Sequence, residues 1–249
     1  MARKTLLEIV QVILNDIDGD EVNSIDDTIE SEQVASVVRS CYEEMVSNRN
    51  WPYHKEMIKL EASGTTSKPN YLKLPERLKE LYFFKYDKAK ITDSKVVYQD
   101  VTYKTPEEFM RYVMSRDSSQ ANIDTIVDIS GVQLLIANNL APSFWTSFDD
   151  DYLITDSYDS AVDTTLQSAK TQVYASMMPI WVHENDAVPD LPITAFSALI
   201  EESKSTASFV VKQMVNQKAE QKATRQQRWL SRKSGRANNG VQYPNYGRK

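Results

Sequence analysis

The stretch 47-SNRNWPYHKEMIKLEA-62 decides the fold, because the spacing of the apolar residues changes within it. Before it, apolar residues at helical spacing predict a helix over residues 31–49. These residues are Val34, Val37, Val38, Cys41 and Met45. The pair Trp51-Pro52 ends that helix, since proline disrupts a helix interior. Beyond the pair, Ile58 and Leu60 alternate with charged residues, which is typical of a strand.

Helical spacing is also found near both ends of the chain. It predicts a helix over residues 4–17 and another that begins at Asp159 or Ser160 and ends before Pro179. The last and longest helix is expected to begin at Ile193 and, with its polar continuation, to reach Leu230. Its apolar stripe consists of Phe196, Leu199, Ile200, Ala207, Val210, Val211 and Met214.

The expected fold class is α+β. It is mainly an α-helical bundle with an inserted β-rich region and a long C-terminal helix that carries a basic extension. Residues 1–50 and 158–215 are expected to form the two parts of the bundle. Residues 51–157 form the β-rich insertion with one short helix, and residues 216–249 form the basic extension. Ser130-Gly131, between two apolar runs, indicates a hairpin within the insertion.

Charge is unevenly distributed along the 249 residues. Residues 203–249 contain 11 lysines and arginines and one acid, Glu220, for a net charge of +10. The rest of the chain holds 18 basic and 34 acidic residues, for a net charge of −16. An acidic body with a basic tail favours interaction with a partner. Cys41 is the single cysteine, so no intrachain disulfide is expected, and no membrane-spanning stretch is visible.

Motifs of catalysis are not found in the sequence. Asp16-Ile17-Asp18-Gly19-Asp20 has Leu14 and Ile25 where a calcium loop needs oxygen ligands, so a polar turn is expected instead. Asp149-Asp150-Asp151 is expected to form a tight turn between extended segments. We therefore expect no enzyme, no catalytic residue, no cofactor and no metal.

The basic tail is the candidate binding segment. Residues 216–228 are good helix formers but show no apolar face, so this segment is expected to order against a partner. The basic residues would contact phosphates or acidic protein surface, and the aromatic residues would stack on bases or fill a protein pocket. The candidate site residues are Lys218, Lys222, Arg225, Arg228, Trp229, Leu230, Arg232, Tyr243 and Tyr246.

Five stretches together resemble a known family. In chain order they are LLEIVQVILNDIDGDEVNSIDD, EEMVSNRNWPYHKE, YLKLPERLKELYFF, PSFWTSFDDDYLITDSYDS followed by MMPIWV, and LPITAFSALIEESKSTASFVVKQMVNQKAEQKATRQQRWLSRK. They are spread over residues 6–233. The chain resembles the podovirus head-to-tail adaptors, also called tail tubular protein A. The C-terminal extension and the middle region are longer here than in the smallest members of that family.

The resemblance implies a structural function. It implies a homo-dodecameric ring beneath the portal protein, a central channel for DNA, and a lower face that receives the tail nozzle. A tail fibre is a further expected partner. The expected location is the virion neck, after assembly in the host cytoplasm. Two other hypotheses remain: a nucleic-acid-binding module that uses the basic tail, and a carboxylate-dependent hydrolase with its site near Asp149, Asp150 and Asp151.

Two expectations about the isolated chain follow. Repulsion between acidic bodies predicts that the free protein is largely monomeric and forms its ring on the portal. The helix without an apolar face predicts that a chain cut after Val215 keeps its thermal stability and loses portal binding.

Overall fold

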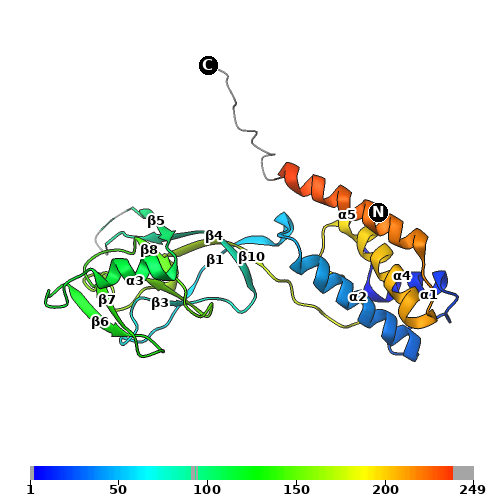
Figure 1. Ribbon diagram of the computed structural model, residues 1–249, viewed down its shortest axis with the longest axis horizontal. Coiled ribbons are helices and arrows are strands. Elements are labelled where there is room, and N and C mark those ends of the chain that lie inside the picture. Colours follow the sequence, from blue (N-terminus) through cyan, green and yellow to red (C-terminus); the bar gives the residue numbers. More distant parts are fainter. Residues whose placement is uncertain (1–2, 91–92, 94, 238–249) are drawn as a thin grey trace, which may run out of the picture. The chain divides into compact units, whose positions relative to one another are not determined.

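The computed structural model describes residues 3–90, 93 and 95–237, with side chains as far as Ser231 in the last helix (Figure 1). The chain forms two compact units. The helical unit comprises residues 1–54 and 178–249, and the β unit comprises Lys55–Met177. No helix among the described residues has the length and apolar character needed to cross a membrane.

Segments from both ends of the chain build the helical unit. Its helices are α1 (Leu6–Asp16), α2 (Ile29–Ser47), α4 (Phe196–Lys212) and α5 (Gln217–Ala237), with short 3-10 turns η1 (Pro52–His54) and η3 (Ile193–Ala195). A capping box starts α1, in which Thr5 and Glu8 bond to each other's backbone amides. Apolar residues of α1, α2 and α4 lie in one core, with Leu6, Val38 and Phe196 completely or almost completely buried.

The β unit contains one eight-stranded sheet and one hairpin. The strand order of the sheet is β1-β10-β4-β5-β8-β9-β3-β2. The strands are β1 (Lys55–Ile58), β2 (Glu61–Ala62), β3 (Tyr71–Lys73), β4 (Leu78–Asp87), β5 (Tyr98–Tyr103), β8 (Phe144–Thr146), β9 (Tyr152–Thr155) and β10 (Thr171–Met177). Strands β6 (Ile123–Val127) and β7 (Gln133–Ala137) form the hairpin, and α3 (Pro106–Met114) packs in the same core through Phe109 and Val113.

The hairpin turn follows the sequence prediction. Residues of β6 and β7 pair in antiparallel register, and Gly131 has a φ of 84°. A side chain is strained at such an angle, so glycine suits this position. The sequence Thr105-Pro106-Glu107-Glu108 has an N-cap residue, a proline at the first helical position and acids in the first turn, and α3 begins there. The Thr105 side chain accepts a hydrogen bond from the amide of Glu108.

The expected fold class is wrong. The chain is a mixed α/β protein with 35% helix and 23% strand, and strands contribute more than a mainly helical bundle allows. The helix expected from Asp159 or Ser160 to before Pro179 does not form. Thr171–Met177 is instead the strand β10, which lies between β1 and β4 in the sheet. Val173 and Ala175 point into the core of the β unit, so tertiary burial outweighs the local helical spacing.

The expected long C-terminal helix is also wrong, because it is two helices. Helix α4 ends at Lys212, and Gln213 adopts the left-handed conformation with a φ of 55°. The amides of Gln213 and Met214 bond to the carbonyls of Phe209 and Ser208, which closes the helix end. Helix α5 then packs back on α4.

We expect Gln213→Gly to stabilise the helical unit by about 0.5–1 kcal/mol, because glycine adopts the left-handed conformation without a steric penalty. Urea unfolding measures the difference. The matched control is Gln221→Gly in the exposed interior of α5, which should destabilise by about 1 kcal/mol. Equal destabilisation by both substitutions would contradict the left-handed turn.

Candidate functional site

Helix α5 has an apolar face that attaches it to the helical unit. Ala219, Ala223 and Leu230 lie on one side of the helix and are buried. Leu230 is only 2% exposed and belongs to the core that also contains Phe196 and Leu199. The expectation that this segment lacks an apolar face is therefore wrong. Two of its three buried residues are alanines, whose weak hydrophobicity gives little signal in a sequence.

Polar contacts add to this attachment. Arg49, which follows α2, donates from its Nη2 to the backbone carbonyl of Gln227 at 2.9 Å and to the side-chain Oε1 of Gln227 at 3.0 Å. Lys222 forms an ion pair with Glu201 of α4, with 3.1 Å between Nζ and Oε1. Burial lowers the pKa of Arg49. These contacts fix α5 along α4, so Lys222 is engaged within the chain.

Four other candidate residues of α5 face solvent. Lys218, Arg225, Arg228 and Trp229 are exposed, and the Trp229 side chain is 49% accessible. Lys218, Lys222, Arg225 and Trp229 are spaced by four, three and four positions, so they form one stripe along the helix. The structure thus gathers four of the predicted residues on one side of α5.

A groove runs beside this stripe. It has a volume of about 560 Å³ and lies between α5 and the start of α4. Its walls are formed by Ile193, Thr194, Ser197, Arg225, Gln226 and Trp229. An exposed aromatic ring beside an arginine and an aliphatic residue is the composition that dominates protein interfaces.

The remaining candidate residues divide into two groups. Leu230 is buried in the core, so its assignment to a partner contact is wrong. The side chain of Arg232, and Tyr243 and Tyr246 entirely, lie outside the described residues. Their role in binding stays a prediction.

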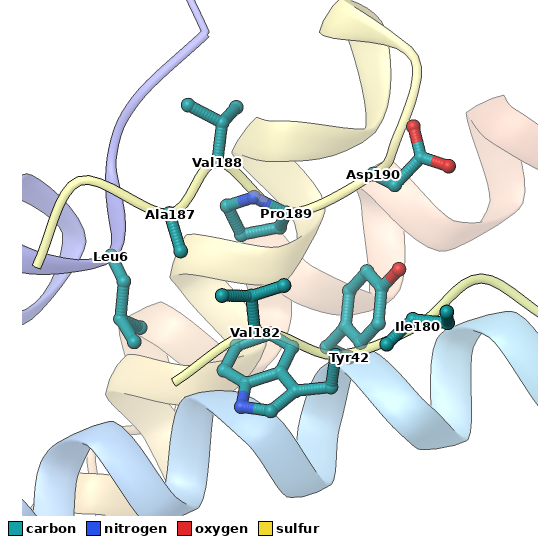
Figure 2. Close-up of a pocket in the computed structure, with 9 residues that line it drawn as sticks. Leu6, Tyr42, Ile180, Val182, Ala187, Val188, Pro189 and Asp190 are labelled. Atoms are coloured by element: carbon teal, nitrogen blue, oxygen red, sulfur yellow. The ribbon is translucent and has the colours of Figure 1, made fainter. Parts of the chain in front are cut away.

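A second recess in the helical unit had no sequence signal. Figure 2 shows Tyr42 of α2 and Val182 facing the backbone of Ala187 and Pro189. The recess has a volume of about 130 Å³. Tyr42 packs against Trp181 with 5.0 Å between ring centroids. The Tyr42 hydroxyl and the Trp181 indole N–H are buried without a hydrogen-bond partner among the described residues. Burial raises the pKa of Tyr42.

The aspartates considered for hydrolysis lie in the turn between β8 and β9. The carboxylate of Asp149 accepts hydrogen bonds from the amides of Asp151 and Tyr152, at 3.1 Å each. Asp150 has a φ of 60°, which an aspartate tolerates in a turn. In the described part of the chain, no three His, Cys, Asp or Glu residues lie close enough to hold a metal ion. The carboxylate of Asp149 therefore serves the turn itself.

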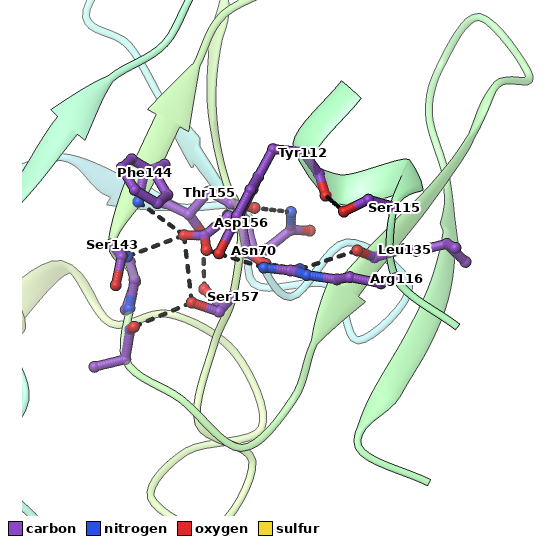
Figure 3. A network of polar contacts seen from close by, with 12 residues as sticks. Asn70, Tyr112, Ser115, Arg116, Leu135, Ser143, Phe144, Thr155, Asp156 and Ser157 are labelled. Atoms are coloured by element: carbon purple, nitrogen blue, oxygen red, sulfur yellow. Dashed lines mark hydrogen bonds and ion pairs between the residues drawn. The ribbon is translucent and has the colours of Figure 1, made fainter. Parts of the chain in front are cut away.

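A buried polar network organises the β unit (Figure 3). The Asp156 carboxylate accepts from the amides of Ser143 and Phe144, at 2.9 and 2.8 Å, and pairs with Arg116 Nη2 at 3.1 Å. Arg116 also donates to the carbonyl of Leu135. Arg116 thereby links the segment after α3 to β7 and to the segment after β9.

The two remaining reactive side chains are packed in the helical core. His54 Nε2 lies 2.7 Å from the carbonyl oxygen of Asp190, and the ring is largely buried. Burial raises the pKa of the Cys41 thiol, which favours the unreactive protonated form. Both residues hold helical elements together in this structure.

Comparison with protein-family models and with curated proteins finds no match for this chain.

Proposed function

We propose that this chain is a structural head-to-tail adaptor of a short-tailed bacteriophage, which forms a ring between the portal and the tail nozzle around the DNA channel. The observation that carries the proposal is the solvent face of α5. Its buried side is fixed by Leu230 and Ala223, and its outer side presents Arg225 and Trp229. A rigid helix with a cationic and aromatic outer face suits docking on another protein.

Charge supports the same proposal. Residues 203–249 carry a net charge of +10 on a chain whose overall charge is −6. The basic face of α5 would attract an acidic portal surface, while the acidic remainder would let DNA pass without adhering. The resemblance to head-to-tail adaptors is carried by stretches spread over residues 6–233, and the last of them contains α5 as far as Lys233.

We expect Trp229→Ala to weaken binding to the portal protein of the same phage by roughly 30-fold, because a central aromatic residue of an interface contributes about 2 kcal/mol. Arg225→Glu should also weaken portal binding. The loss of affinity should be larger at low salt than at high salt, since salt screens the attraction between charges. Sedimentation of the portal with labelled protein measures both affinities.

Arg111→Glu is the matched control, because Arg111 is an exposed helical arginine of the β unit that pairs with Glu107. It should leave portal affinity unchanged. Wild-type affinity in both the Trp229 and Arg225 variants would contradict the proposal. The nucleic-acid alternative would be favoured if the same variants lost salt-sensitive binding to duplex DNA while no portal binding occurred.

A further inference from the structure

The end of helix α4 carries an exposed apolar patch. Phe209 and Met214 are 63% and 69% exposed, and Val210 and Val215 are exposed beside them. We call residues 209–215 the α4 knob. The predicted apolar stripe contains Val210 and Met214, but both are exposed in the structure, and Met214 lies beyond the turn at Gln213. Clustered exposed apolar residues on a folded unit mark a site of protein association.

The same unit contains a complementary recess. The small recess beside Tyr42 (Figure 2) has mainly apolar walls, and its rim residues Ile180, Val182 and Val188 are exposed. We call this recess the α2 socket. Its volume of about 130 Å³ suits one aliphatic or thioether side chain.

The knob and the socket lie at opposite ends of the same helices. Lys212 pairs with Glu30 in the first turn of α2, whereas Tyr42 lies twelve residues further along α2, about 18 Å away. Helix α1 runs in the opposite direction and spans about 15 Å from Leu6 to Asp16. Leu6 at its start lines the socket, and Asp16 at its end pairs with Lys204 of α4. The knob of one chain therefore cannot fill its own socket.

The charges of the two segments are opposite. Residues 178–190, which form most of the socket wall, contain Glu184, Asp186 and Asp190 and no lysine or arginine. Residues 203–219, which contain the knob, include three lysines and no acid. Lys212 is paired with Glu30, while Lys218 is exposed next to the knob. Opposite charges would steer the knob to a socket on another molecule.

We propose that the α4 knob of one copy inserts into the α2 socket of a second copy of this chain. Different surfaces meet in this contact, so the association is head-to-tail and generates a ring when the rotation between copies closes. Met214, the most exposed residue of the knob, fills the socket beside Val188. This proposal rests on the proposed function in one respect only: the ring is the reason for taking a second copy of this chain as the molecule that fills the socket.

The test is cysteine cross-linking of the full chain with a short bismaleimide, which traps transient contacts between copies of a protein that is expected to be largely monomeric when free. Met214→Cys and Val188→Cys are combined in one chain, because both positions are exposed. The native Cys41 is buried and its pKa is raised, so it contributes little background. We expect a ladder of dimers, trimers and larger species, at roughly tenfold higher yield than in a control with Met214→Cys and Val127→Cys, because a specific contact concentrates the two thiols.

Mixing the two single-cysteine chains distinguishes head-to-tail from symmetric pairing. A chain with Met214→Cys mixed with a chain with Val188→Cys should give one heterodimer and nothing larger. A homodimer of the Met214→Cys chain as its main product, or no ladder above the control yield, would overturn the inference. A ladder in a protein that binds no portal would leave the inference standing and count against the proposed function alone.

Discussion

Arg116→Met is expected to destabilise the β unit by about 3–5 kcal/mol, the largest stability effect that the described contacts predict for one substitution. The Asp156 side chain is only 4% exposed, and Arg116 supplies its positive partner. Methionine keeps much of the side-chain volume and removes the charge and the hydrogen bonds to Leu135 and Asp156. A buried carboxylate without its cation is costly, because neither water nor a counter-charge replaces the lost contacts. Urea unfolding followed by tryptophan fluorescence measures the loss.

Two further variants separate the charge from the side-chain packing. Arg111→Met removes an exposed ion pair with Glu107 and should cost less than about 1 kcal/mol. Asp156→Asn combined with Arg116→Met should recover part of the stability, because an asparagine oxygen can still accept from the amides of Ser143 and Phe144 without a buried charge. Equal stabilities of the Arg116 and Arg111 single variants would show that the network does not hold the β unit together.

A chain cut after Val215 is expected to lose about 3 kcal/mol of stability in its helical unit. Removal of α5 exposes the core face that Leu230 covers, and burying one leucine is worth about 1.5–3 kcal/mol. The cut also leaves Arg49 without Gln227, and a hydrogen bond to a charged group contributes about 1.5–3 kcal/mol. Thermal unfolding followed by circular dichroism measures the loss. This replaces the expectation that such a cut leaves the stability unchanged.

A chain cut after Ala237 is the matched control, since it keeps the whole of α5 and every contact described for it. Its melting temperature should equal that of the full chain. If both cuts melted with the full chain, α5 would not be part of the folded helical unit. Because the cut after Val215 alters stability, loss of portal binding by that chain would be ambiguous, and the Trp229 point variant is the cleaner functional test.

The candidate site was only partly visible in the sequence. Arg225 and Trp229 could be selected because cationic and aromatic residues in a polar helix have few intramolecular uses. The sequence alone could not show that Lys222 and Leu230, unlike Arg225 and Trp229, are used in contacts within the chain. Lys222 pairs with Glu201 and Leu230 enters the core, and both contacts depend on how α5 lies along α4. The socket beside Tyr42 was not detectable, because its walls come from three distant segments of the chain.

The sequence by itself determined where helices give way to strands after Trp51, how Thr105 starts its helix, and the turn at Gly131. Each depends on residues within a few positions of one another, so local propensity and periodicity suffice. The sequence placed the start of the second helix at residue 31, whereas Thr28 caps α2 in the structure. The tertiary structure decided that Thr171–Met177 is a strand and that the chain reverses at Gln213. Val173 is helical by spacing but is buried between β1 and β4, and glutamine has no local preference for a left-handed turn. Both features exist because burial in a shared core, contributed by residues far apart in the sequence, outweighs a local preference worth less than about 1 kcal/mol per residue.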